Sequence, residues 1–130
     1  MERLTLKARI SVLWLSMAVA MSAHSVFGFM ERDAAEQIWE MQLGAGMLVV
    51  MALLYVGPLI MAVLSLSLED AANRWANIVL GIVFTLFNVW HLVEHLTTGP
   101  VVHQILIIAS TVVFTGLIAW SAWRWPIEKE

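Results

Sequence analysis

Four long apolar stretches take up most of this 130-residue chain, and they constrain its fold more than any other feature. They cover residues 10–30, 43–66, 76–96 and 101–123. Each reaches the roughly 20 apolar residues that a helix needs to cross a bilayer. Only 13% of the residues are charged, against roughly 25% in a typical soluble domain. Because backbone polar groups in lipid must be paired within each segment, the pattern predicts an all-α polytopic membrane protein.

The connections between these stretches are short, which favours an up-down-up-down bundle of four transmembrane helices. We expect one transmembrane domain over residues 1–130, with an outer loop at 31–42 and an inner turn at 67–75. The acidic outer segment is compatible with a short helix on the membrane surface or with an ordinary loop. The first apolar stretch exceeds the length of a signal-peptide h-region, so we expect it to be a retained helix.

Lys and Arg fall almost entirely on one side of the predicted membrane. The inner side holds Arg3, Lys7, Arg9, Arg74, Arg124 and Lys129. Arg32 alone falls on the outer side. Because basic residues in short loops stay in the cytoplasm, this bias predicts a multi-pass membrane protein with cytoplasmic N- and C-termini.

The composition also excludes several classes of function. The chain has no cysteine, which removes disulfides, thiolate metal sites and iron–sulfur clusters. Its net charge is −3 and its basic residues form no patch, so we expect no nucleic-acid partner. The lipid bilayer is the expected partner. Four spans enclose little internal space, so we also expect a homo-oligomer or a subunit of a membrane complex.

The second stretch contains Gly57 and Pro58 well inside its apolar run. Proline leaves the carbonyl four residues earlier without its helical donor and bends the helix. We therefore predict a kink at these two residues. Such kinks are common in membrane helices as structural features, and some act as hinges.

The ionisable groups inside the apolar stretches all lie toward the outer side. They are His24, His91, Glu94, His95 and His103. At about 100° per residue, Asn88, His91 and His95 fall along one stripe of a helix, with Glu94 beside it. If the helices turn these faces inward, all four histidines converge near the outer mouth of the bundle. They are then candidate metal ligands, and Glu94 and Asn88 form a candidate polar or proton site.

Several chemistries fit such a cluster. Imidazoles four residues apart on a helix can share a divalent metal ion. Haem held between His24 and His91 is a second possibility. The string at residues 91–95 also matches the H-x-x-E-H pattern of zinc peptidases. We discount a peptidase, because the only downstream carboxylates lie on the far side of the membrane.

The motifs NRWANI at residues 73–78 and WSAWRW at residues 120–125 resemble those of an uncharacterised family of small bacterial four-helix integral membrane proteins. The resemblance implies the fold and the inner (plasma) membrane of a bacterium or archaeon. It implies no catalytic or binding residue.

The favoured function is a ligand, metal or haem-binding site at the extracytoplasmic mouth of the bundle. One alternative is a proton-coupled small transporter or channel that uses Glu94. Another is an accessory or scaffold subunit in which the histidines only bond to backbone, headgroups or water. The chain carries no decisive sign of an enzyme.

Overall fold

The structure is a computed structural model that describes residues 2–126, apart from the side chains at positions 32 and 34. The described residues form five helices and no strand. The helices are α1 (Glu2–Met30), α2 (Arg32–Glu40), α3 (Ala45–Ser67), α4 (Asp70–Thr98) and α5 (Val102–Trp123). All except α2 are long and apolar enough to cross a membrane, so the chain is a multi-pass membrane protein.

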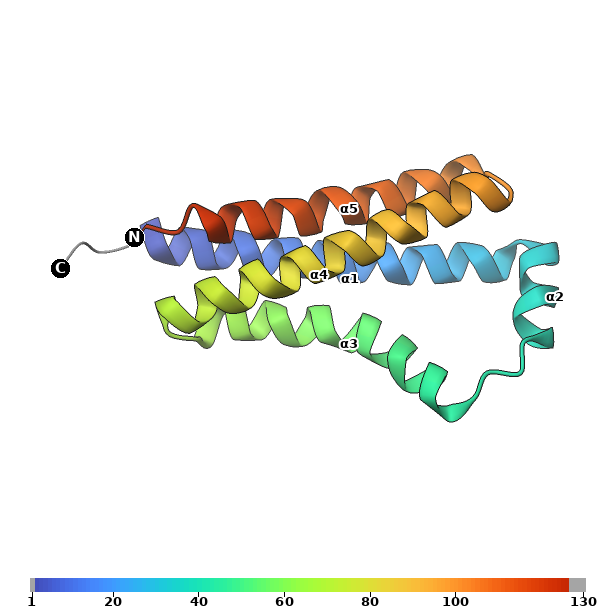
Figure 1. Cartoon of the computed structure of the whole chain (residues 1–130), viewed down its shortest axis with the longest axis horizontal. Helices are drawn as coiled ribbons and strands as arrows, with labels where there is room; N and C mark the ends of the chain where they lie inside the picture. Colours follow the sequence, from blue (N-terminus) through green and yellow to red (C-terminus); the bar gives the residue numbers. More distant parts are fainter. Residues whose placement is uncertain (1, 127–130) are drawn as a thin grey trace.

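The four long helices run alternately up and down along one axis (Figure 1), which confirms the predicted all-α four-helix bundle. α1 packs against α3 and α5, and α4 packs mainly against α5. The short α2 crosses the end of the bundle opposite the N-terminus (Figure 1). We call that end the α2 end.

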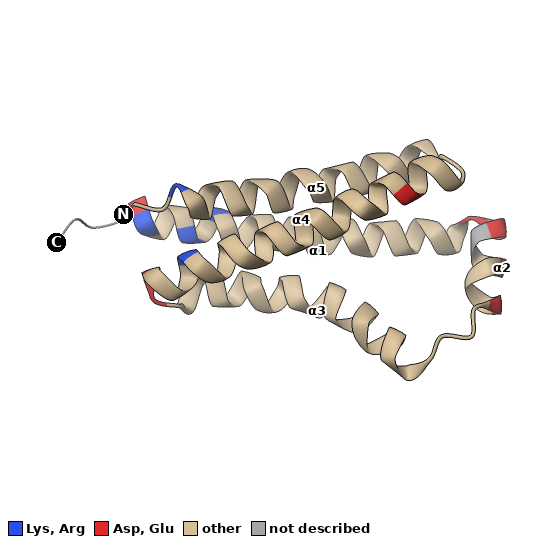
Figure 2. Ribbon diagram, in the orientation of Figure 1, with Lys and Arg blue, Asp and Glu red and all other residues tan. Residues whose placement is uncertain are grey.

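Basic residues gather at the other end of the bundle (Figure 2), which we call the basic end. Those described there are Arg3, Lys7, Arg9, Arg74 and Arg124. Lys129, predicted for the same side, lies outside the described residues. Arg32 begins α2 at the opposite end.

The helices extend beyond the apolar stretches at the basic end. The prediction of an inner turn at 67–75 is wrong, because only Leu68 and Glu69 separate α3 from α4. Asp70, the first residue of α4, pairs with Arg3 at 2.9 Å and with Lys7 at 3.0 Å. Lys7 also donates to the carbonyl of Leu68 at 2.9 Å. These contacts to α1 stabilise polar helical turns that hydropathy alone does not reveal.

The segment predicted as an outer loop contains α2, so the short surface helix is the alternative that the structure favours. α2 begins directly after Glu31, whose backbone is extended (φ −83°, ψ 117°). The indole of Trp39 on α2 is 81% exposed. An amphipathic ring at this position suits the interface between lipid and water.

The hydrophobic core lies in the basic half of the bundle. It comprises Ile10, Trp14, Met61, Ala62, Ile78, Ile118, Ala122 and Trp125. A buried polar network runs through it. Asn77 of α4 accepts from the Trp14 indole at 2.6 Å and from the Ser65 hydroxyl at 3.2 Å. Asn73 donates to the Ser65 carbonyl at 2.7 Å. One network thus joins α1, α3 and α4.

α4 approaches α5 closely at Gly81. A Cβ atom at this position would lie 3.0 Å from the backbone nitrogen of Ala119. Small residues allow helix backbones to approach closely in membranes, and a side chain at this position would press on the backbone of α5.

We expect Gly81→Val to lower the free energy of unfolding by about 1–3 kcal/mol, the usual cost of overpacking. The added side chain would push α4 and α5 apart. Unfolding in mixed detergent and SDS micelles measures this loss. The matched control is Gly116→Val on α5, where an added Cβ meets nothing within 4 Å. Equal stability of the two variants would contradict the close packing.

α3 contains Pro58 inside a continuous helix. The ribbon of α3 bends part-way along, and its N-terminal part leans away from the other helices (Figure 1). Such a bend is what a proline inside a helix is expected to produce. Met47, Leu48 and Val49 on the leaning part are all more than half exposed. The α2 end is therefore less tightly packed than the basic end.

Candidate metal centre

Three imidazoles meet between α1 and α4 near the α2 end. The ring nitrogens that His24, His91 and His95 offer lie within 4.8 Å of one another. The ring centroids are 4.7–5.1 Å apart. All three residues are partly buried. The structure therefore places three of the four predicted ligands in one group.

The register of the two helices brings the rings of His24 and His91 to one depth. The ion pair between Arg3 and Asp70 places the starts of α1 and α4 side by side. His24 follows Arg3 by 21 residues, and His91 follows Asp70 by the same 21. At 1.5 Å per residue, both lie about 31 Å from that ion pair. His95 is one helical turn beyond His91 and therefore shares its face of α4.

Gln104 of α5 orients the ring of His24. Its amide nitrogen faces two acceptors, the His24 carbonyl and a Glu31 carboxylate oxygen, both at 3.3 Å. This fixes the amide orientation, so the amide oxygen Oε1 faces Nδ1 of His24, at 2.5 Å. Because Oε1 can only accept, Nδ1 carries the hydrogen and Nε2 of His24 keeps its lone pair.

Glu94 lies on the same side of His91, at a longer distance. Its carboxylate oxygen lies 3.6 Å from Nδ1 of His91. This distance is within ion-pair range but longer than a hydrogen bond, so Glu94 lies beside His91 without fixing which ring nitrogen carries the hydrogen. The Nε2 atoms of His24 and His91 face each other at 3.1 Å, a distance at which Nε2 of His91 can donate to Nε2 of His24. A cation shared by both rings would take the place of the hydrogen between them.

The spacing agrees with a tetrahedral metal site. Zinc–imidazole bonds of about 2.0–2.1 Å place two ligand nitrogens about 3.3 Å apart. The His24–His91 pair, at 3.1 Å, is already close to this value. The longest separation in the group must close by at most about 1.5 Å, which small rotations of the rings can supply. A carboxamide and a carboxylate behind the ligands are typical outer-shell partners of metal-bound histidine.

The remaining predicted residues lie outside this group. His103 binds the Glu31 carboxylate at 2.6 Å, and its side chain is 48% exposed. Asn88 is fully buried and donates weakly to Thr111 and Thr115 of α5, both at 3.4 Å. Asn88 thus acts between helices and not as a ligand.

Sequence reasoning missed Gln104 and Glu31. Gln104 is 4% exposed and connects α5 to both α1 and the segment before α2. A signal was present, because a glutamine interrupts an otherwise apolar run close to the depth of His24. It was not singled out because the prediction rested on the histidines and on the polar stripe of the third apolar stretch.

No protein-family model, curated protein or solved structure matches this chain. The resemblance of the motifs at 73–78 and 120–125 to a small bacterial family therefore stays a prediction. In this structure Asn73 and Asn77 of the first motif belong to the buried network of the basic half.

Proposed function

We propose that this protein binds one divalent transition-metal ion, such as Zn²⁺ or Cu²⁺, through His24, His91 and His95. The observation that carries the proposal is the group of three imidazoles, with the Nε2 atoms of His24 and His91 at 3.1 Å and all three candidate ligand nitrogens within 4.8 Å of one another. Neutral imidazole suits zinc, copper, iron and nickel, whereas magnesium and calcium prefer oxygen ligands. A fourth coordination position stays open for water or another ligand.

The same distance argues against haem between His24 and His91. A bis-histidine haem needs its two axial nitrogens on opposite sides of a flat ring. Two metal–imidazole bonds set those nitrogens about 4 Å apart. At 3.1 Å, with the imidazole planes at 85°, the two rings leave no slot for a porphyrin.

The arrangement of Glu94 supports binding more than catalysis. Its carboxylate lies against Nδ1 of His91, on the far side of that ring from Nε2. It therefore orients a ligand and is not placed to act as a base on metal-bound water. In this proposal Glu94 is part of the metal site and not an independent proton carrier.

We further propose that the metal centre lies toward the extracytoplasmic side of a bacterial inner membrane. The support is the gathering of Lys and Arg at the basic end (Figure 2), since basic ends of membrane bundles remain in the cytoplasm.

Metal analysis of the purified protein tests the function. We expect one Co²⁺ or Zn²⁺ per chain, with the visible absorption of tetrahedral Co²⁺. Replacing His24, His91 and His95 together with alanine should abolish it. Binding of less than one tenth of an equivalent at micromolar metal, or unchanged binding in the triple variant, would overturn the proposal.

We expect Gln104→Leu to weaken Zn²⁺ binding by roughly 10–100-fold, the usual effect of losing an outer-shell partner. Leucine cannot accept from His24 Nδ1, so the ring loses its fixed tautomer and orientation. Competition with a fluorescent zinc chelator measures the change. His103→Ala is the control, because it removes the neighbouring imidazole and leaves Gln104 in place. Equal losses in both variants would contradict the role of Gln104.

A further inference from the structure

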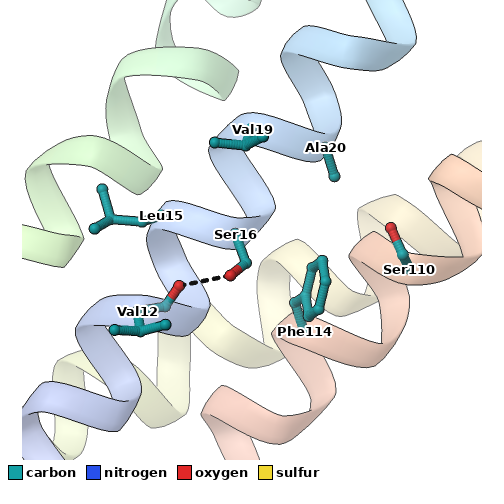
Figure 3. A pocket seen from close by; sticks show the side chains of 7 residues that line it. All are labelled: Val12, Leu15, Ser16, Val19, Ala20, Ser110 and Phe114. Atoms are coloured by element: carbon teal, nitrogen blue, oxygen red, sulfur yellow. Dashed lines mark hydrogen bonds between the residues drawn. The ribbon is translucent and has the colours of Figure 1, made fainter.

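A groove runs along the outward side of the seam between α1 and α5 (Figure 3). It has a volume of about 440 Å³. The lining residues are Val12, Leu15, Ser16, Val19 and Ala20 of α1, with Ser110 and Phe114 of α5. Ser16 donates to the Val12 carbonyl at 2.9 Å (Figure 3), and Ser110 to the Ile107 carbonyl at 2.6 Å. Both hydroxyls therefore already have a hydrogen-bond acceptor, and the groove offers a mainly apolar surface to a bound molecule.

A second hollow, of about 470 Å³, lies on the same two helices at the basic end. Its lining residues are Glu2, Thr5, Leu6, Arg9, Arg124 and Pro126. Arg9 and Arg124 are exposed, and no carboxylate in the described part of the chain pairs with either guanidinium. Arg124 lies over the ring of Trp120, 5.7 Å from its centroid. Two unpaired guanidiniums beside an interfacial tryptophan suit an anionic group at the membrane surface.

The two hollows share one face of α1. Their lining positions follow one another at intervals of three and four residues, from Thr5 through Arg9, Val12 and Ser16 to Val19. Residues with this spacing lie on one side of a helix. From Arg9 to Ala20 the rise is about 16 Å. That is about half of a hydrocarbon layer of about 30 Å, and it therefore matches the chain of a lipid in a single leaflet.

We propose that this seam binds one anionic glycerophospholipid of the leaflet at the basic end. Its phosphate contacts Arg9 and Arg124, since guanidinium forks match phosphate oxygens in bidentate geometry. One acyl chain lies in the apolar groove between Val12 and Phe114. Two guanidiniums against the carboxylate of Glu2 leave net positive charge, so an anionic headgroup is favoured over a zwitterionic one.

Native mass spectrometry of the intact protein in detergent tests this site. The probes are dioleoyl phosphatidylglycerol and dioleoyl phosphatidylcholine, which carry the same chains and differ in headgroup charge. We expect phosphatidylglycerol to bind at least tenfold more tightly, and the R9Q/R124Q double variant to lose that preference. R74Q is the control, because Arg74 lies on α4 outside the groove. Equal binding of the two lipids, or an unchanged preference in R9Q/R124Q, would overturn the proposal.

The acyl chain is tested separately. We expect Ser16→Leu, which fills the groove, to weaken phosphatidylglycerol binding about fivefold. Ser22→Leu is the matched control, since Ser22 also donates to the carbonyl four residues back but does not line the groove. Inorganic phosphate should displace little lipid. If it displaces all of the lipid, or if Ser16→Leu binds like wild type, the site holds only a phosphate and the lipid assignment is wrong.

Discussion

Replacing His91 with alanine is expected to lower Zn²⁺ affinity by more than roughly 100-fold, beyond the 10–100-fold typical of an outer-shell loss. The change removes one of three ligands and the one whose Nε2 lies nearest to that of His24. It also leaves Glu94 with no ring to orient. Isothermal titration of the purified protein with Zn²⁺ measures the affinity.

His103→Ala provides the comparison for that experiment. His103 is also an imidazole at the α2 end, but it binds Glu31 and stands outside the group of three. Its removal should change Zn²⁺ affinity less than threefold. If His103→Ala and His91→Ala weaken binding equally, the ion is bound by a different set of ligands or only at the surface.

Asn77→Leu is expected to lower the free energy of unfolding by about 2–4 kcal/mol. Leucine leaves the Trp14 indole and the Asn73 side chain without their partner in a buried region. Each buried unsatisfied group costs about 1–3 kcal/mol. The expected loss exceeds that of a single interhelical bond in a membrane protein, which averages about 0.6 kcal/mol. Unfolding in mixed detergent and SDS micelles measures it.

Asn88→Leu serves as the matched control, because Asn88 is an equally buried asparagine of the same helix. Its two bonds are long, both at 3.4 Å, and its carbonyl oxygen has no partner among the described residues. We therefore expect a loss below about 1 kcal/mol. A larger loss in Asn88→Leu than in Asn77→Leu would show that the polar network of the basic half is not a main source of stability.

The membrane-spanning helices could be predicted from sequence because hydropathy and length decide them. Lipid leaves few alternatives to a helix for a stretch of this length. The helical turns at 70–75 could not be predicted from hydropathy, because they are polar; in the structure Asp70 pairs with Arg3 and Lys7 of α1. The composition of the acidic segment at 31–42 fits both a loop and a surface helix. Which of the two forms therefore depends on the tertiary context.

The candidate site was predicted only in part. The spacing of four residues on one helix predicted that His91 and His95 act together. The approach of His24 required the register between α1 and α4, which the contact at their starts sets. His103 lies outside the group of three histidines because it binds Glu31. The position of Glu31 depends on the path of the chain from α1 into α2, which the sequence does not reveal. From the sequence, Gln104 could be identified only by considering that an amide side chain inside a membrane-spanning stretch needs a hydrogen-bond partner.

The core of this protein is concentrated at one end of the bundle, and the histidines lie at the other. A bound ion would cross-link α1 to α4 in the half where packing supports them least. Ligand binding to a folded state raises its apparent stability in proportion to RT ln(1 + [L]/Kd). Because packing is weaker at this end, local unfolding of the metal-free protein should begin beside the imidazoles. Hydrogen exchange of the amides near His24 should slow on adding metal, while those around Trp14 stay unchanged.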